Sequence, residues 1–175
     1  TMMHRLLAAV PGFTALWWWE TAFPLPLPDE AADDPAPRQE AARQMVDWLL
    51  THQQVDARWC LIHATQMVPH ETEAMAKSGA IAGLCPITEA NLGDGIFDGV
   101  RFQAHGGVYG VGSDSNVRIS LSEELRLLEY SQRLAGKGRA MLAVEGRSTG
   151  RVLYETACKG GALAAGRQGG AIAVG

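Results

Sequence analysis

The sequence predicts an α/β fold in which short parallel strands alternate with helices. Apolar runs of the kind that is buried on both faces of a parallel sheet recur at intervals of about 25 residues, and a helical pattern follows each one. The chain has 175 residues, whereas a complete eight-stranded barrel usually needs about 250. Periodicity therefore leaves two architectures open, an open sheet or part of a larger barrel.

Composition indicates a soluble domain without a polyanionic partner. Lys and Arg number 15 against 19 Asp and Glu, 47% of the residues are apolar, and the basic residues form no cluster. We therefore expect neither a nucleic-acid nor a membrane partner. The 3 cysteines show no C-x-x-C spacing, which favours a reducing, cytoplasmic compartment. Pro11 and Gly12 interrupt the apolar run from Leu6 to Trp19, so a signal segment is not expected.

The chain divides near residue 40. Residues 24–37 hold five of the 8 prolines together with an acidic run, a composition that neither a helix nor a central strand accommodates. Ala42, Met45, Val46 and Leu49 then recur at helical spacing and predict a helix from Gln39 to Thr51. We accordingly expect a degenerate, largely irregular segment over residues 1–38 and an ordered α/β unit over residues 39–175.

The remaining elements follow from apolar runs and their boundary residues. Gly79 is placed to end a helix in the left-handed conformation, and Ser120 with Glu123 matches a capping box. A polar loop is expected over 86–95. The predicted strands are Trp59–Ile62, Ala80–Cys85, Val108–Gly112 and Ala171–Val174, and the predicted helices are Glu71–Lys77, Asp98–Ala104, Ser120–Leu134 and Val152–Cys158.

Polar residues follow three of the predicted strands. His63 follows the first, residues Pro86 to Asn91 follow the second, and Asp114 follows the third. Ligand groups gather where parallel strands end. An imidazole and a carboxylate placed there can converge on one metal ion or one water molecule, and both suit zinc.

Simpler readings of these residues stay open. A histidine after a strand is more often a hydrogen-bonded structural residue than a ligand. Asp114 lies in a loop composition in which aspartate commonly accepts backbone N–H groups. Asn91 to Gly95 can be read as an ordinary turn. Cys85 has no cationic neighbour in the sequence that would lower its pKa, and it reads as a small core residue.

Four segments together resemble the formimidoylglutamate deiminases of the amidohydrolase superfamily. The resemblance covers residues 40–175, and the unbroken run from Cys85 to Gly95, CPITEANLGDG, separates this family from other deaminases. The segments are Trp59–Thr65, Ser78–Phe97, Gly110–Asn116 and Glu124–Leu134.

The resemblance implies the C-terminal half of a (β/α)8 TIM-type barrel and a zinc-dependent hydrolase. Enzymes of this family hydrolyse the amidine N-formimidoyl-L-glutamate to N-formyl-L-glutamate and ammonia in histidine degradation. Asp114 matches the aspartate that contacts the metal and takes the proton of the attacking water. His63 matches the histidine that orients this water and the tetrahedral intermediate.

The sequence also departs from the family pattern. The two metal ligands of a His-x-His motif would precede Thr1, and no histidine occurs at residues 24–31, where a further ligand is expected. Glu30 is the available carboxylate for a proton shuttle, and Gln66 replaces a histidine. One histidine and one aspartate are too few for a catalytic zinc site, so we expect the chain alone to be nearly inactive.

Three readings follow from these features. The first is an enzyme lineage with His63 and Asp114 as parts of the site, and the second is a non-catalytic remnant or interaction module without metal. The third is an unrelated cytoplasmic α/β domain. Because half a barrel leaves strand edges unpaired, we also expect a homo-oligomer or other self-association.

Overall fold

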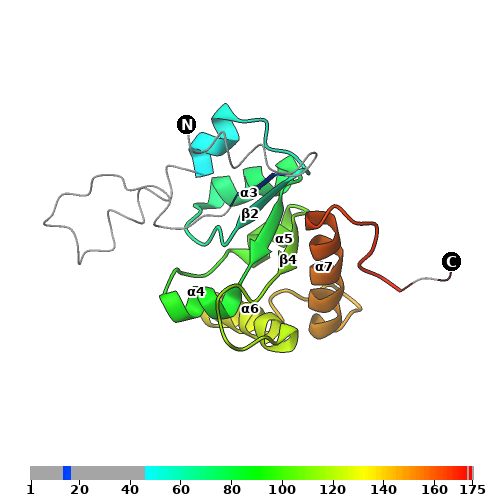
Figure 1. Ribbon diagram of the computed structural model, residues 1–175. Coiled ribbons are helices and arrows are strands. Elements are labelled where there is room, and N and C mark those ends of the chain that lie inside the picture. The colour runs from blue at the N-terminus through cyan, green and yellow to red at the C-terminus, as the bar shows by residue number, and fades with distance from the viewer. Residues whose placement is uncertain (1–13, 17–45, 173, 175) are drawn as a thin grey trace, which may run out of the picture.

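The structure is a computed structural model that describes residues 14–16, 46–172 and 174. Strands and helices alternate along most of the chain (Figure 1). In chain order the elements are β1 (Thr14–Leu16), β2 (Trp59–Ile62), α3 (Pro69–Ser78), β3 (Ile81–Leu84), α4 (Pro86–Leu92), α5 (Gly99–Ala104), β4 (Val108–Val111), α6 (Leu121–Gly136) and α7 (Thr149–Ala164).

The strands form one parallel sheet in the order β1-β2-β3-β4. β2 has the predicted bounds, and β3 and β4 lie within their predicted runs. Their side chains are mostly buried, as expected for a sheet covered on both faces. β1 adds three residues of strand within the segment expected to be largely irregular. Residues 17–38 lie outside the described residues.

Four of the helices confirm predictions from the sequence. α3 ends at Gly79, whose φ of 83° is left-handed as predicted. Asp98 precedes α5 and accepts a hydrogen bond from the backbone N–H of Arg101. α7 is longer than the predicted helix at both ends, and the hydroxyl of Ser148, just before its first residue, accepts the backbone N–H of Arg151. Residues 46–52 are helical, whereas residues 39–45 lie outside the described part of the chain.

The loop predicted over residues 86–95 is wrong in its first part, which forms α4. Pro86 occupies the first helical turn, where the missing N–H of proline costs no hydrogen bond. Gly93 ends the helix with a φ of 73°. Because residues 86–95 are largely polar, the sequence predicted a loop where the structure has a helix, and this helix carries the buried carboxylate of Glu89.

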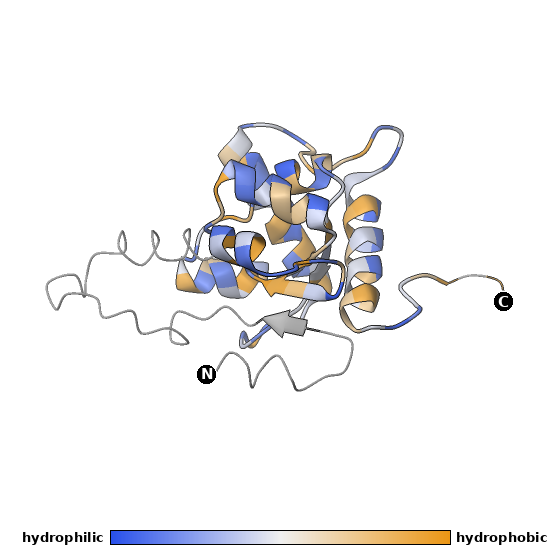
Figure 2. Cartoon of the chain, turned by 90° about the horizontal axis from the view of Figure 1, so that it is seen from above, coloured by the Kyte–Doolittle hydropathy of each residue, from blue (hydrophilic) through white to orange (hydrophobic). Residues whose placement is uncertain are grey.

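Two further predictions are corrected. Ser120 does precede α6, but its side chain makes no capping bond; Glu123 instead pairs with Arg118 and Arg126, which removes it from the capping box. The strand predicted at Ala171–Val174 is absent at residues 171, 172 and 174. This segment leaves the body after α7 (Figure 2), and Ile172 is fully exposed, so none of the described strands lies beside it.

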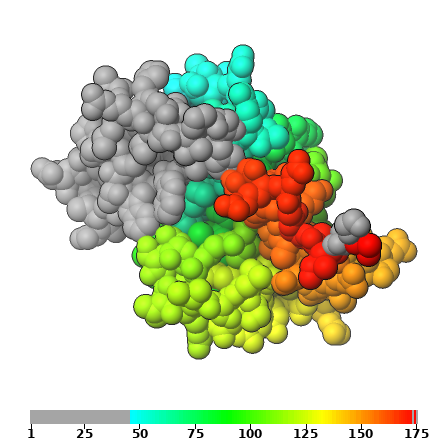
Figure 3. Space-filling view, turned by 45° about the vertical axis from the view of Figure 1, so that its right-hand side comes forward, coloured from blue at the N-terminus to red at the C-terminus, as the bar shows by residue number. Residues whose placement is uncertain are grey.

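The core lies between the sheet and its helices. Phe97 and Phe102 pack edge to face at 5.1 Å, and Met75, Leu84 and Tyr109 are fully buried. α7 packs against β4 and β3, α3 contacts α5, and α4 contacts α6. Figure 3 shows α7 in orange at the surface, with the following segment in red. None of the helices in the described residues is long and apolar enough to cross a membrane.

Candidate metal and active site

The parallel ladder aligns the ends of β2, β3 and β4. The backbone N–H of His63 donates to the carbonyl of Gly83 at 2.8 Å, and that of Gly112 donates to the carbonyl of Leu84 at 2.9 Å. The hydrogen bonding thus continues one residue past β2 and β4. His63, Cys85 and the turn that carries Asp114 therefore meet at the carboxyl edge of the sheet.

The backbone at this edge adopts an uncommon conformation. His63, Ala64 and Asp114 have φ values of 64°, 51° and 49°. Left-handed φ is uncommon for residues other than glycine, and such strain concentrates at functional sites, where the surrounding structure holds it in place. The two residues singled out from the sequence are both among these positions.

The structure brings His63 and Asp114 together. Nε2 of His63 lies 3.7 Å from Oδ2 of Asp114, and the two side chains are 8% and 5% exposed. The residues are far apart in the sequence, and β2 and β4 are not adjacent in the sheet. Their convergence across β3 is the geometry that the strand-end argument requires.

Glu89 of α4 holds the other side of the His63 ring. Its Oε1 lies 3.2 Å from Nδ1 of His63 and accepts the backbone N–H of Cys85 at 2.7 Å. An ionised carboxylate only accepts hydrogen bonds, so Nδ1 carries a proton and Nε2 faces Asp114. Glu89 was not among the site residues predicted from the sequence. The available signal was a carboxylate in the first turns of a helix that begins with proline at the end of a strand.

Opposing effects act on the pKa of His63. Burial lowers it, but the hydrogen bond to Glu89 and the charges of Glu89, Asp114 and Asp94 outweigh burial and raise the pKa above its ordinary value. The environment therefore favours a positive charge at this position.

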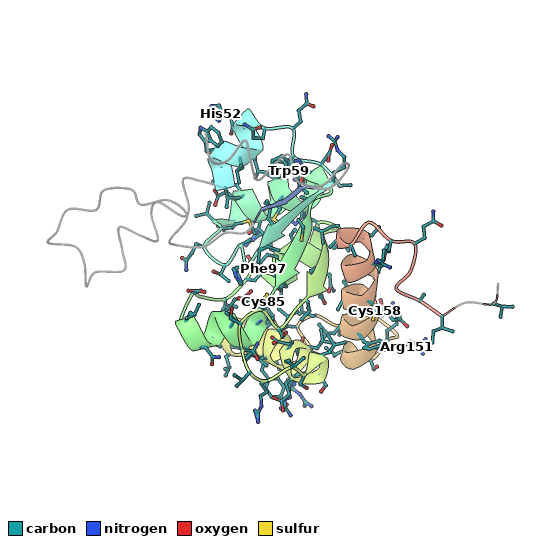
Figure 4. The ribbon with its side chains drawn as sticks, in the orientation of Figure 1. His52, Trp59, Cys85, Phe97, Arg151 and Cys158 are labelled. Carbon is teal, nitrogen blue, oxygen red and sulfur yellow. The ribbon has the colours of Figure 1, made fainter. Side chains whose placement is uncertain are left out.

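Cys85 completes the group at the end of β3. One ligand atom from each of His63, Cys85 and Asp114 lies within 4.8 Å of the others. Burial raises the pKa of the Cys85 thiol to about 12, with smaller contributions from the charges of Glu89, Asp114 and Glu124. The thiol is thus protonated in the absence of a cation. Figure 4 labels it between the sheet and α4.

A second set of polar contacts supports the turn at Asp114. The carbonyl of Ser113 accepts the Thr88 hydroxyl at 3.2 Å and also the Asn116 amide. Glu124 of α6 accepts Nδ2 of Asn116 at 3.1 Å and the backbone N–H of Ile87 at 2.8 Å. α4, α6 and the turn are therefore linked through buried groups.

The residues present fit a metal ion. Oδ2 of Asp114 is buried and has no hydrogen-bond partner among the described residues, although a buried carboxylate oxygen normally has one. Within the described part of the chain, the hydrogen bond found at Oδ1 comes from the Ser115 hydroxyl, at 3.3 Å, and not from a backbone N–H as considered from the sequence. Imidazole nitrogen, thiolate sulfur and carboxylate oxygen are all zinc ligands.

Other residues considered from the sequence take different places. Gln66 donates through Nε2 to the carbonyl of Asp94, and the Thr65 hydroxyl donates to the same carbonyl at 2.7 Å. These contacts tie the chain after β2 to the end of α4. Glu30 and the rest of residues 24–31 lie outside the described residues.

Solved structures with a similar fold are amidohydrolases and related enzymes. An amidohydrolase from Brucella melitensis is 61% identical with a TM-score of 0.69, over 70% of this chain and 27% of that chain. Atrazine chlorohydrolase TrzN from Arthrobacter aurescens, complexed with zinc, is 25% identical with a TM-score of 0.55, over 69% of this chain and 26% of that chain. An adenosine deaminase from Xanthomonas campestris with bound zinc is 18% identical with a TM-score of 0.56, over 79% of this chain and 41% of that chain. At this identity the likeness concerns the fold alone.

A protein of similar sequence belongs to one kind of amidohydrolase, the formimidoylglutamate deiminases. The chain is 52% identical over 136 residues to the formimidoylglutamate deiminase of Pseudomonas aeruginosa, which is 77% of this chain and 30% of that protein. No protein-family model matches the chain. The resemblance to the formimidoylglutamate deiminases is therefore confirmed, for a chain that spans about 30% of the length of this relative.

Proposed function

We propose that the chain is the C-terminal part of a metal-dependent hydrolase that converts N-formimidoyl-L-glutamate to N-formyl-L-glutamate and ammonia in histidine degradation. The observation that carries this proposal is the convergence of His63 and Asp114 at 3.7 Å. It occurs in a chain 52% identical to part of a formimidoylglutamate deiminase. The substrate is therefore a small amidine.

The architecture proposed for the whole enzyme is a (β/α)8 barrel, with residues 39–175 forming its C-terminal half. The four parallel strands and the helices between them support this arrangement. So does the fraction of the solved relatives that the chain covers, between 26% and 41%. The outer strands β1 and β4 each have one neighbour in the described sheet, which leaves room for further strands.

Asp114 and His63 divide the chemistry between them. A zinc ion beside Asp114 would supply a bound water whose pKa lies near neutrality. Oδ2 of Asp114 accepts the proton of the attacking water. Nε2 of His63 faces the same point and orients the water and the tetrahedral intermediate. Glu89 fixes the imidazole by holding Nδ1 at 3.2 Å.

The chain by itself is proposed to be nearly inactive. A catalytic zinc site usually has three protein ligands and an open position for water. In the described residues, His63, Cys85 and Asp114 are the group close enough to hold an ion. This group contains one histidine.

We further propose a cytoplasmic location. All 3 cysteines, Cys60, Cys85 and Cys158, carry free thiols, which suits a reducing compartment. The resemblance to a metabolic deiminase points the same way.

A chimeric enzyme tests the proposed activity. Residues 46–172 would replace the corresponding part of the Pseudomonas aeruginosa deiminase, and ammonia release from N-formimidoyl-L-glutamate would be measured. We expect an active chimera in which Asp114→Asn and His63→Asn each lower kcat about 10²–10⁴-fold, with unchanged circular dichroism. Glu145→Gln, at an exposed position, is the matched control.

Two results would count against the proposal. A folded chimera that releases no ammonia would favour the non-catalytic remnant. An active chimera that tolerates Asp114→Asn would remove Asp114 from the reaction.

A further inference from the structure

We propose that Glu124 of α6 is a positioning residue that sets the geometry of His63 relative to Asp114. Its buried carboxylate accepts one hydrogen bond from α4, which orients the first of these residues, and one from the turn that carries the second. The inference rests on the proposed function, because it concerns the residues to which that function assigns the chemistry. It adds α6 to the parts of the fold on which the site depends.

The Glu124 carboxylate joins two segments that are remote from it in the chain. The residue is 1% exposed, and a buried charge needs hydrogen-bond partners. Oε2 accepts the backbone N–H of Ile87 at 2.8 Å, and Oε1 accepts Nδ2 of Asn116 at 3.1 Å. These donors lie 37 and 8 positions away, and neither belongs to α6. Each carboxylate oxygen thus binds a different segment.

The hydrogen bond to Ile87 fixes the beginning of α4. The first N–H groups of a helix have no partner within it, so the N–H of Ile87, in the first turn, needs an acceptor from elsewhere. α4 and α6 lie side by side (Figure 1), and Glu124 supplies this acceptor. Glu89, two positions further along α4, holds Nδ1 of His63 at 3.2 Å. A displacement of the first turn of α4 would therefore move the His63 ring.

The hydrogen bond to Asn116 supports the turn that carries Asp114. The Asn116 side chain donates both to Glu124 and to the carbonyl of Ser113, and its backbone N–H donates to the same carbonyl at 3.3 Å. These contacts close the turn around Asp114, whose φ of 49° is left-handed. Such a conformation persists only where the surrounding structure holds it. Asn116, fixed in turn by Glu124, is one of the groups that do so.

The site needs both connections at once. Nε2 of His63 and Oδ2 of Asp114 lie 3.7 Å apart, on segments that follow strands not adjacent in the sheet. The Thr88 hydroxyl also links α4 to the turn, through the carbonyl of Ser113 at 3.2 Å. Glu124 completes this frame from the side of α6. Because a reaction slows markedly when one of its groups is misplaced, the reaction should depend on a carboxylate that acts through its neighbours.

Glu124→Gln tests the two connections with little change in the size of the side chain. A carboxylate accepts hydrogen bonds through both oxygens, whereas an amide has a single acceptor oxygen. One of the two N–H groups therefore loses its partner. In amide NMR spectra of the metal-free 175-residue chain, the signals of residues 87–89 or 113–116 should shift, while those of α7 should stay in place.

Glu129→Gln is the matched control. Glu129 is also a buried carboxylate of α6, 3% exposed, but it accepts the backbone N–H groups of Met141 and Leu142 in the segment before α7. Its substitution should weaken the fold and leave the signals of residues 87–89 and 113–116 unchanged. Thermal unfolding of both variants separates a loss of stability from a loss of positioning.

Kinetics of the chimera provide the second readout. Glu124→Gln should lower kcat about 10–100-fold, the usual effect of removing a residue that orients the groups of a site. KM should change little, because the loss of an interaction made only in the transition state lowers kcat without raising KM. Glu129→Gln should retain kcat. If Glu124→Gln does not fold, Asn116→Ala, at a half-buried position, removes the connection to the turn alone and should lower kcat in the same way.

Unshifted signals of both segments in Glu124→Gln and Asn116→Ala, or kcat values equal to that of Glu129→Gln, would overturn the proposal. A wild-type chimera that releases no ammonia would count against the proposed function instead. The amide shifts of the free chain would then still decide whether Glu124 holds these two segments.

Discussion

Glu89 accepts a hydrogen bond from Nδ1 of His63 at 3.2 Å, through the same carboxylate oxygen that accepts the backbone N–H of Cys85. One side chain of α4 thus sets the imidazole orientation and fixes the end of β3. Carboxylates that hold a histidine ring in this way commonly tune metal sites. We regard Glu89 as a positioning residue.

Glu89→Gln should lower the pKa of His63. The hydrogen bond and charge of Glu89 raise this pKa, whereas burial lowers it. With the charge removed, the effect of burial gains weight. An NMR pH titration of the His63 ring in the metal-free chain measures the change, and exposed Glu145→Gln serves as control. An unchanged His63 pKa would show that the contact with Glu89 carries little energy.

Glu124 should make the stability of the fold depend on pH. Burial raises its pKa above the ordinary value of 4.5, although hydrogen bonds from Ile87 and Asn116 oppose this. The folded state therefore binds the proton more tightly than the unfolded state. This contribution to stability is present at low pH and is lost as pH rises through the raised pKa.

Urea unfolding of the wild type and Glu124→Gln across this range provides the measurement. As pH rises above 4.5, the free energy of unfolding of the wild type should fall relative to that of the variant. A relative gain for the wild type would reverse the sign and contradict the assignment.

Gly160 should tolerate no side chain. A Cβ there would lie 2.0 Å from the carbonyl oxygen of Tyr109, because α7 packs directly on β4. Gly160→Ala should lower the free energy of unfolding by about 3 kcal/mol. Its neighbour Gly161 has open space around a Cβ, so Gly161→Ala should stabilise the helix by up to about 1 kcal/mol. Equal effects of the two substitutions would refute this packing.

Glu129 should be a main anchor of the segment between α6 and α7. Its buried carboxylate accepts Nε of Arg133 at 2.6 Å and the backbone N–H groups of Met141 and Leu142 at 2.9 and 3.0 Å. Glu129→Ala leaves these donors without an acceptor and should cost about 3 kcal/mol. Thermal or urea unfolding measures it, against Glu145→Ala. A loss no larger than in the control would contradict the anchoring role.

The isolated chain should self-associate. Val117 is 99% and Ile119 84% exposed, and β1 and β4 each lack a second neighbour in the described sheet. Apolar surface and unpaired edges favour association. Size-exclusion chromatography with light scattering should show species larger than a monomer, and replacing Val117 and Ile119 together by Ser should reduce them. A monomer at all concentrations would argue against this expectation.

The sequence predicted the strands better than their surroundings. The buried apolar runs at β2, β3 and β4 are short, bounded by glycine or polar residues and spaced for parallel crossovers, so local composition was sufficient. The same reasoning failed at Ala171–Val174, because an apolar run forms a strand only beside a partner, and none is near in the described residues. Apolar composition alone does not reveal whether a partner is present.

Part of the site was likewise accessible from sequence. His63 and Asp114 follow strands, and the carboxyl ends of parallel strands share one edge. Glu89 and Cys85 were harder to recognise. The role of Glu89 depends on α4 beginning immediately after β3, and that of Cys85 depends on carboxylates contributed by α4, α6 and the turn after β4. These are tertiary relationships that no local pattern encodes.

Anomalous diffraction at the zinc edge, from crystals of the chain grown with zinc, is the most direct test of a cation-binding group at the carboxyl edge of the sheet. We predict one strong peak in contact with the carboxylate of Asp114, at the point that Nε2 of His63 faces. A peak bound elsewhere, or His63 and Asp114 pointing to opposite sides of the molecule, would contradict the account.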